Sequence, residues 1–340
     1  MSFEIVTSGL LTSVQDAGRF GRQRVGMSPA GAMDARSMSL ANLLVGNPTG
    51  TGVLECTLMG PTLRFDRANV VALTGADMAP TLDGRAVPMG RAFPVTAGSV
   101  LKLGSAKNGC RTYIAFHGGL DIPPVDGSQS TLLRGGIGGY QGRKLAAGDR
   151  IGFAAPAGSL KNLALRRLPE PQSFANEVTV RVVPGPQEDR FTPAGLETFY
   201  SQPFTVGVQS DRMASRLEGP KVEHTTDANI LSDGIPLGAV QIPGSGQPII
   251  MMSEHQGSGG YTKIANVISV DIPLVAQCPP GSKIRFRAVN VEESQQLYLA
   301  QLEEYRRLQT AFEMDYRDIF RISVNGQEIV VGVALRGDEN

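Results

Sequence analysis

Two glutamines and a lysine in the second half of the chain are residue types suited to binding an amide or a lactam. Gln241 and Gln256 carry amides that both donate and accept hydrogen bonds, as recognition of another amide requires. Tyr261 and Lys263 follow a pair of glycines, and the Lys263 ammonium can meet an acyl phosphate, a carbamate or a carboxylate. The alternatives are a solvated surface lysine, and glutamines that only satisfy backbone groups inside a barrel.

Glycine-rich segments of the first half hold a second set of polar residues. Asp16 and Arg19 can clamp a carboxylate or phosphate, because a guanidinium is a bidentate donor; alternatively they form a loop ion pair. Three hydroxyl groups and an arginine surround the next glycine cluster and predict an anion or carbonyl site: Ser128, Ser130, Thr131 and Arg143. The alternative is a turn whose hydroxyl groups bond only to their own backbone.

Asp211 and Arg212 stand where we expect a short helix to begin, as binding residues or as a plain N-terminal cap and charge. His255 is a candidate acid or base because the ordinary pKa of histidine lies near neutrality, whereas we expect His117 to be structural. The P-loop, the Rossmann glycine motif, HExxH and GxSxG are all absent from the sequence. The residues alone therefore identify no reaction and predict no metal.

The composition excludes several classes of protein. The 340 residues carry 32 basic and 32 acidic side chains, so binding to nucleic acid or to an anionic membrane lacks its usual electrostatic support. Neither a secretory signal nor a membrane-spanning stretch is expected, and the three cysteines form no CxxC pair. We therefore expect a cytoplasmic protein whose Cys56 and Cys278 are small core residues.

The elements that must position these residues are mainly strands. With 41 glycines, 22 prolines and no tryptophan, the composition suits many short strands and tight turns. We predict a β-barrel-like domain over 1–160, a linker over 161–177, a second barrel over 178–290, and a helix with a hairpin over 291–340. Local signals predict helices after Asp34, Thr192, Ser210 and Asn290, and hairpin turns at Asp83-Gly84, Asn108-Gly109 and Asn325-Gly326.

The long helix predicted over 291–312 has a face of Leu and Tyr side chains that needs burial. That face either binds a partner or packs on the chain's own second barrel. The two alternatives are equally compatible with the sequence.

Short motifs recur in a fixed order over residues 3 to about 290. In the first half they are Ser13–Arg19, Gly31–Asp34, Ala41-Asn42, Leu54-Glu55, Leu73–Asp77, Gly118–Asp121, Gly127–Thr131 and Gly142–Leu145. In the second half they are Ser210–Met213, Arg216–Pro220, Pro236–Gln241, Gly246–Ile249 and Gly259–Tyr261. Their combined order and spacing resemble the family of allophanate hydrolase subunit 2, which includes the KipI antagonist, the C subunit of 5-oxoprolinase and part of the carboxyltransferase region of urea carboxylase.

The resemblance implies a cyclophilin-like β-barrel in this protein and in its partner, the KipI-like allophanate hydrolase subunit 1. It further implies a third, LamB/YcsF-like subunit, and a complex that opens 5-oxoproline to glutamate at the expense of ATP. With the family match, the predicted catalytic residues are Arg143, Asp211, Gln241 and Lys263. The predicted substrate-binding residues are Arg19, Asp34, Ser128, Ser130, Thr131, Arg212, Gln256 and Tyr261.

Two other functions fit the same family. One is a carboxyltransferase component for urea or a related amide, with biotin carried by another protein, because this chain has no Met-Lys-Met biotinylation site. The other is a non-catalytic antagonist of a KipI-like kinase inhibitor.

One segment departs from the family pattern. Residues 256–262 read Gln-Gly-Ser-Gly-Gly-Tyr-Thr, where relatives commonly have Gln-Thr-Thr-Gly-Gly-Tyr-Pro. The two glycines keep the loop, whereas the loss of two threonines makes a different substrate an open alternative. The helix and hairpin at the C-terminus lie outside the resemblance.

Overall fold

The computed structural model describes residues 2–155, 158–316, 318–325 and 327–334. The strands of the first half are β1 Ser2–Thr7, β2 Leu11–Gln15, β3 Val53–Thr57, β4 Thr62–Phe65, β5 Asn69–Asp77, β6 Thr81–Leu82, β7 Arg85–Ala86, β8 Arg91–Val95, β9 Val100–Lys102, β10 Asn108–Phe116, β11 Leu120–Asp121 and β12 Arg150–Phe153. They form two sheets, with strand orders β11-β12-β1-β4-β9-β6-β7 and β2-β3-β10-β5-β8.

The apolar runs of β5 and β10 are buried along almost their whole length because both of their faces are covered. Between the two sheets, Phe3 of β1 stacks on Phe116 of β10 with ring centroids 4.7 Å apart. On the other face lies α1, Ala35–Leu44, whose N-cap Asp34 accepts a hydrogen bond from the backbone N–H of Ser37 at 2.8 Å. The helix predicted after Asp34 is confirmed.

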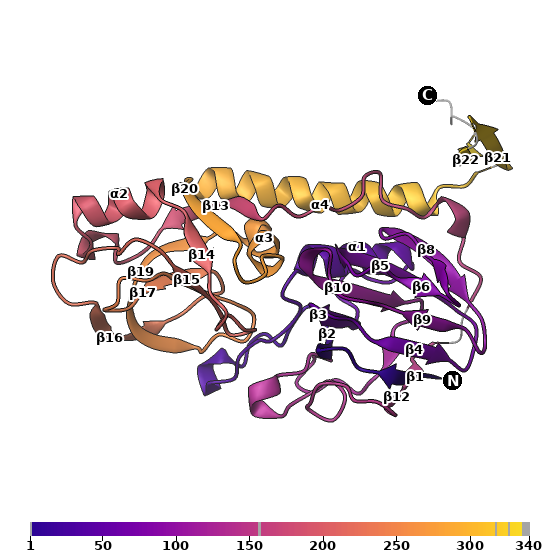
Figure 1. Ribbon diagram of the computed structural model, residues 1–340, viewed down its shortest axis with the longest axis horizontal. Coiled ribbons are helices and arrows are strands. Elements are labelled where there is room, and N and C mark those ends of the chain that lie inside the picture. Colours follow the sequence, from indigo (N-terminus) through magenta and orange to yellow (C-terminus); the bar gives the residue numbers. More distant parts are fainter. Residues whose placement is uncertain (1, 156–157, 317, 326, 335–340) are drawn as a thin grey trace.

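The second half forms a closed barrel (Figure 1). Its strands are β13 Glu177–Pro184, β14 Phe204–Val206, β15 Ala214–Glu218, β16 Asn229–Gly234, β17 Ala239–Ile242, β18 Ile249–Met251, β19 Ser258–Val267 and β20 Lys283–Ala288. The order is β13-β20-β14-β15-β18-β17-β19, and β13 also pairs with β19, which closes a ring of seven strands. Strand β16 adds to β19 outside this ring. The mainly β fold predicted from the composition is confirmed.

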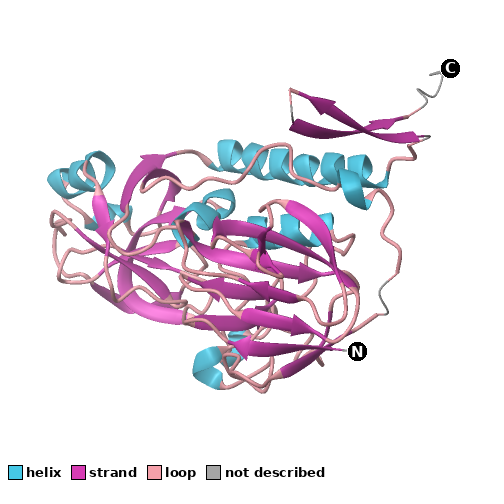
Figure 2. Ribbon diagram, turned by 45° about the vertical axis from the view of Figure 1, so that its right-hand side comes forward, coloured by secondary structure: helices cyan, strands magenta, loops and turns pink. Residues whose placement is uncertain are grey.

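Helix α4, Val291–Glu313, leaves the barrel and runs back across the first domain (Figures 1 and 2). Leu308 and Phe312 are buried with the apolar side chains of α1, and Arg36 of α1 pairs with Glu304 at 2.7 Å. The C-terminal part of the apolar face is therefore covered by the first domain, which neither alternative from the sequence named. The helix also contacts residues 269–271 of the second domain.

Beyond α4, strands β21 Asp318–Val324 and β22 Gln327–Val333 form the predicted hairpin. Its predicted turn at Asn325-Gly326 includes a residue outside the described ones, as does the end of the region predicted over 291–340.

The segment between the two domains is bonded to the first one. Gln172 accepts a hydrogen bond from the N–H of Gly75 at 2.7 Å and donates one to the hydroxyl of Ser37 at 2.9 Å. Asn108 bonds to both the N–H and the carbonyl of Phe174. The domain boundaries predicted above stay predictions. The segment is packed against the first domain and is not a free linker.

Three other local predictions are confirmed. Helix α2, Pro193–Ser201, begins after Thr192, helix α4 begins after Asn290, and Asp83-Gly84 joins β6 to β7.

Two are wrong. No helix starts at Ser210, because the Asp211 carboxylate accepts the N–H groups of Met213 and Ala214 and the chain passes directly into β15. Asn108-Gly109 is an irregularity within β10 rather than a turn. Among the described residues, no helix is long and apolar enough to cross a membrane.

The packing of α4 predicts that alanine substitutions at different positions of this helix change the free energy of unfolding by different amounts. Phe312→Ala should lower the free energy of unfolding by about 3 kcal/mol, because it empties a buried site between α4 and α1. Leu299→Ala, at a position 62% exposed, should change it by less than about 0.5 kcal/mol. Urea denaturation of both variants measures this, and equal effects would contradict the packing.

Candidate functional site

A cavity of about 490 Å³ lies on the outer side of the barrel wall, over strands β15, β17 and β18. Val240 and Ile242 point into the barrel core, so Gln241 between them points outward, as strand alternation requires. The lining combines polar and apolar side chains. It includes Gln209, Gln241, Gln247, Gln256, Arg216, Glu218 and Tyr261, together with Met213, Ile249 and Met251.

Gln241 is a buried polar side chain with an unused donor. It is 2% exposed, and its amide nitrogen Nε2 has no hydrogen-bond partner. It lies opposite Ile249 on β18 and opposite Lys263 on β19. A buried donor without a partner costs about 1–3 kcal/mol. Because the side chain also lines the cavity, this donor is a candidate contact for a ligand there.

Gln256 brings a second amide to the same place. A Cβ atom built on Gly259 would lie 2.8 Å from Nε2 of Gln256 and 3.3 Å from Nε2 of Gln241. Any side chain at Gly259 would therefore crowd the two amides. Cδ1 of Ile235 lies 2.6 Å from the same position, so the position itself is filled. Two NH₂ groups this close together can still donate to one carbonyl or carboxylate oxygen beside them.

Lys263 lies beside this pair under strand β16. Its side chain is only 4% exposed, and Nζ is 2.9 Å from Oδ2 of Asp233, whose own side chain is 57% exposed. The hydrogen bond from Lys263 is the main reason that the pKa of Asp233 is lowered. Lys263 is therefore not the solvated surface lysine that was one alternative. It is a buried ammonium held by a carboxylate at the surface.

The segments that carry Met213 and Gln256 are fixed by a buried ion triad between the domains. Arg212 donates from Nε to Glu254 at 2.7 Å and from Nη1 to Glu55 of β3, and its Nη2 donates to the carbonyl of Gly31 at 2.6 Å. All three charged side chains are less than 6% exposed. Desolvation opposes the charge on Arg212, but the two carboxylates outweigh it, so the pKa of Arg212 is raised.

Gln277 makes a second link across the domain interface. Its Oε1 accepts the N–H groups of Cys110 and Arg111, both at 2.9 Å. Its Nε2 donates to Oδ2 of Asp34 at 2.8 Å and to the carbonyl of Arg111 at 2.9 Å. Asp34 is thus both the cap of α1 and a partner of the second domain, and burial raises its pKa.

The predicted residues of the first half form a separate cluster. Asp16 accepts hydrogen bonds from the hydroxyl groups of Ser128 and Ser130, and Thr131 donates to the carbonyl of Val14. Arg19 is fully buried and donates to the carbonyls of Val125 and Ser130, both at 2.9 Å. These groups hold the first loop to the 125–131 loop, so the hydroxyl groups bond to a distant segment rather than only to their own turn. A binding role for these residues stays a prediction.

Arg143 and Asp211 lie outside the cavity. Arg143 makes a bidentate pair with Asp149, at 2.7 and 2.8 Å. Asp211 reaches Arg134 of the first domain at 3.2 Å, so it joins the two domains at their surface. The role of both in catalysis stays a prediction.

His255 and His117 have similar environments. Nδ1 of His255 is 2.9 Å from the carbonyl oxygen of Gln256, and Nδ1 of His117 is 2.7 Å from that of Val45. Each ring is thus held by a backbone carbonyl, local for His255 and from the end of α1 for His117, where a structural role was expected.

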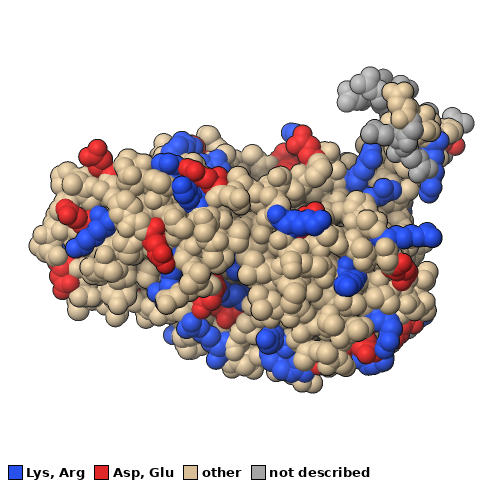
Figure 3. Space-filling model, in the orientation of Figure 1, with Lys and Arg blue, Asp and Glu red and all other residues tan. Residues whose placement is uncertain are grey.

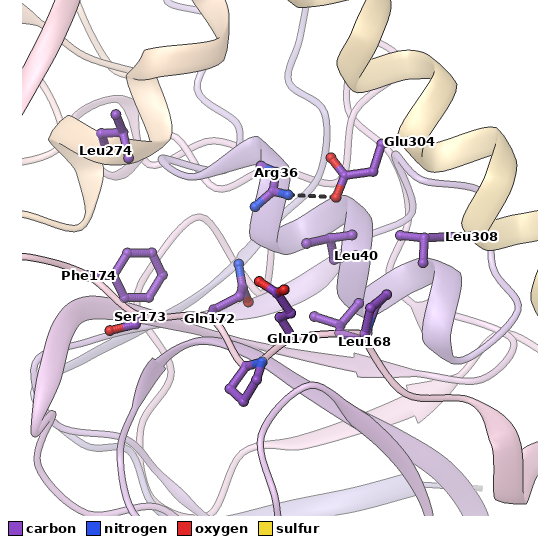
Figure 4. A pocket seen from close by; sticks show the side chains of 12 residues that line it. Arg36, Leu40, Leu168, Glu170, Gln172, Ser173, Phe174, Leu274, Glu304 and Leu308 are labelled. Carbon is purple, nitrogen blue, oxygen red and sulfur yellow. Dashed lines mark hydrogen bonds and ion pairs between the residues drawn. The ribbon is translucent and has the colours of Figure 1, made fainter.

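Another cavity, of about 380 Å³, lies between α1, α4 and residues 168–174 (Figure 4). Figure 4 shows Arg36 and Glu304 joined across one side of it, with Leu40, Leu168 and Leu308 nearby. Its charged arginine is already paired and several of its walls are apolar. We therefore place the candidate site at Gln241.

The sequence did not identify several residues that support the site. Asp233 carried no signal, because it lies in an exposed edge strand and meets Lys263 only through the pairing of β16 with β19. Gln277 also carried none. Glu55 had one: it is a carboxylate within the apolar run Val53-Leu54-Glu55-Cys56, which predicts a buried charge that needs a partner.

Comparisons with known proteins give consistent results. A family profile described as carboxyltransferase domain, subdomain A and B, matches residues 25–288. The chain is 40% identical over 305 residues to the C subunit of 5-oxoprolinase from Escherichia coli K12, with 88% of this chain and 97% of that protein covered. It is also 34% identical over 316 residues to urea amidolyase of Saccharomyces cerevisiae, of which the chain covers only 17%.

Among solved structures, the urea amidolyase of K. lactis has a similar fold, with a TM-score of 0.83 and 32% sequence identity. The match covers 90% of this chain and 20% of that one. In that urea amidolyase, the matching fold is thus one section of a much longer polypeptide.

The two buried glutamines predict opposite responses to the same substitution. Gln241→Leu should leave the free energy of unfolding unchanged or raise it by up to about 1–3 kcal/mol, because it removes a buried donor that has no partner. Gln277→Leu should lower it by at least about 3 kcal/mol, because it removes four buried hydrogen bonds across the domain interface. Chemical denaturation compares them, and a large loss for Gln241→Leu would contradict an unused donor.

Asp34 predicts a pH-dependent term in stability. Its folded pKa is raised above the ordinary value of 3.8, so the folded state favours the neutral acid and this term weakens stability as pH rises through the folded pKa. Asparagine is an equally good N-cap and does not titrate. The free energy of unfolding of Asp34→Asn, relative to that of the wild type, should therefore increase from pH 3 to pH 7, as the pH rises through the raised pKa of Asp34. A difference that is constant with pH would contradict this.

Proposed function

The chain belongs to the family of carboxyltransferase subdomains A and B, and from this premise we propose that it is a subunit of an ATP-dependent 5-oxoprolinase. The assembled complex converts 5-oxoproline, ATP and water to L-glutamate, ADP and phosphate. The observation that carries the proposal is that the Gln241 and Gln256 amides both line the cavity and approach each other beside Gly259. A lactam presents to such donors an oxygen that becomes more negative as the ring is activated.

The residues of the cavity have complementary roles in this proposal. The amides of Gln241 and Gln256 orient the lactam oxygen, and the exposed Tyr261 lines the open outer side of the site. Lys263 lies next to Gln241 and supplies positive charge as negative charge develops on the substrate. Asp233 holds the ammonium in place, and Arg212 holds the backbone of both lining segments. Arg212 is thus a positioning residue.

ATP belongs to the complex rather than to this cavity alone. The sequence has no P-loop, and the two glutamine amides and the tyrosine hydroxyl are neutral groups that suit a lactam better than a triphosphate. We infer that the pair formed with a KipI-like subunit activates the lactam oxygen by phosphorylation. The LamB/YcsF-like subunit then completes hydrolysis. A reducing, cytoplasmic compartment fits the three buried free thiols.

The carboxyltransferase function is the second candidate, because urea amidolyases contain the same fold. In that case a biotin carried by another protein would enter the cavity, and urea would take the place of the lactam. The oxoprolinase is the better supported, since the match to the bacterial subunit has the higher identity and spans nearly its whole length.

Isolation of the tagged protein from its native host tests the two functions directly. Copurification with two small unbiotinylated subunits, and ATP hydrolysis that depends on 5-oxoproline, are the expected results. A streptavidin-reactive carboxylase among the partners, together with urea-dependent ATP hydrolysis, would overturn the proposal in favour of carboxyl transfer. A complex that turns over neither substrate would favour the KipI antagonist.

Within the reconstituted complex, Gln241→Leu and Lys263→Met should each lower kcat for 5-oxoproline-dependent ATP hydrolysis by about 100-fold, because each removes a donor or charge from the reacting oxygen. Lys283→Met, at an exposed position of β20, is the matched control and should leave kcat unchanged. Normal turnover by the Lys263 variant would show that the site lies elsewhere.

A further inference from the structure

The cavity at Gln241 contains a row of side chains that runs across the barrel strands. Arg216 of β15 lies opposite Ile249 of β18, and Ile249 lies opposite Gln241 of β17. The next residue, Leu217, belongs to the barrel core, so Arg216 points outward to the side where Gln241 lies. Because neighbouring strands are about 4.8 Å apart, the Cα atoms of Arg216 and Gln241 are roughly 10 Å from each other. Both side chains line the cavity, with the apolar Ile249 between them.

The backbone of Arg216 is fixed, whereas its guanidinium is unpaired. The N–H of Arg216 donates to the hydroxyl of Ser210 at 3.0 Å, and its carbonyl accepts the N–H of Gly207 at 2.8 Å. Within the part of the chain that the structure describes, the guanidinium forms no ion pair and no hydrogen bond. Arg212, four residues earlier, differs because two carboxylates hold it. The Arg216 guanidinium is therefore a candidate contact for an anionic group in the cavity.

Arg216 is the one basic side chain that the described residues contribute to the cavity lining. The other charged side chain there is Glu218, on the same face of β15, and the two form no ion pair. The chain as a whole has no net charge, and Figure 3 shows basic and acidic side chains interspersed over the face that it displays. Because the net charge provides no general attraction for an anion, recognition of an anionic group requires an individual side chain such as Arg216.

The order of groups in this row matches the chemistry of 5-oxoproline. The molecule carries a carboxylate on the ring carbon next to the nitrogen, and the lactam carbonyl lies on the other side of that nitrogen. Its two polar groups are thus joined by a ring that is largely apolar. The row presents the Gln241 amide, the Ile249 side chain and the Arg216 guanidinium in the same order. A guanidinium also fits a carboxylate well, since it has two donors for two oxygens.

We propose that Arg216 is a specificity residue of this site, which binds the carboxylate of the ligand while Gln241 binds the lactam oxygen. The inference rests on the proposed function, which places a lactam at Gln241. It adds the class of substrate, a lactam that also bears a carboxylate, as distinct from a neutral amide such as urea. The carboxylate does not react, so Arg216 binds the ground state and the transition state equally and acts on KM rather than on kcat. The competing interpretation is an exposed arginine that contacts only solvent.

Steady-state kinetics of the reconstituted complex test this with 5-oxoproline and 2-pyrrolidinone, which is the same lactam without the carboxylate. Arg216→Gln should raise KM for 5-oxoproline at least about tenfold, because it removes charged hydrogen bonds, and leave kcat unchanged. With 2-pyrrolidinone, kcat/KM should be the same for the variant and the wild type. Arg216→Lys should recover part of the loss, since it keeps the charge without the fork. Glu218→Gln, on the same strand face, is the matched control and should not raise KM for 5-oxoproline.

Titration calorimetry of the complex without ATP measures binding apart from turnover. The wild type should bind 5-oxoproline at least about tenfold more tightly than 2-pyrrolidinone, and Arg216→Gln should lose this preference. Thermal melting shows whether the variant is folded, as the exposed position of Arg216 predicts.

Three results would overturn the assignment of Arg216: an unchanged KM for 5-oxoproline in Arg216→Gln, an equal loss with both lactams, or wild-type binding that ignores the carboxylate. In the first case, normal turnover by the wild type would leave the proposed function intact. A wild-type complex that prefers 5-oxoproline through Arg216 in calorimetry but does not hydrolyse ATP would refute the proposed function and leave the assignment standing.

Discussion

The guanidinium of Arg212 between Glu55 and Glu254 is the interaction on which the rest of the structure depends. It joins a strand of the first domain to two segments of the second, and all three side chains are excluded from water. Two carboxylates share one cation, and the remaining acceptor capacity of Glu55 is met by Tyr113 and the N–H of Met33. Removal of one member of such a buried set costs about 3–5 kcal/mol, because charges are left without partners.

This buried charge makes the domain arrangement specific rather than merely stable. Apolar surfaces of similar size would tolerate rotation of one domain on the other, whereas the donors of Arg212 reach their three acceptors in only one orientation. The same residue begins the segment that carries Met213, and its backbone carbonyl accepts the N–H of Glu254. The cavity wall is therefore held by the contact that holds the two domains.

Local signals in the sequence were sufficient where local hydrogen bonds decide the structure. Asp34, Thr192 and Asn290 each cap a helix through the N–H three residues ahead. The helix predicted after Ser210 was wrong for the same kind of reason, because the Asp211 carboxylate forms a tight turn that leads into β15. The path of α4 could not be predicted, since an amphipathic helix does not specify which domain covers its apolar face. The separation of Arg143 from Gln241 could not be predicted either. The family motifs suggest one site for both residues, but the fold places them in different domains.

The candidate site itself was predicted in part, and the reason is chemical. Gln241, Gln256, Tyr261 and Lys263 are residue types whose groups suit an amide. The first three line the cavity, and Lys263 lies opposite Gln241 on β19. What the sequence could not show is the contrast between Gln241 and Gln277. Both are buried glutamines, yet Gln277 uses every hydrogen bond that it can make across the interface, whereas Gln241 leaves its amide nitrogen unused. A folded chain that tolerates such a donor, next to a glycine at which any side chain would crowd it, retains a binding capacity that its own fold does not consume.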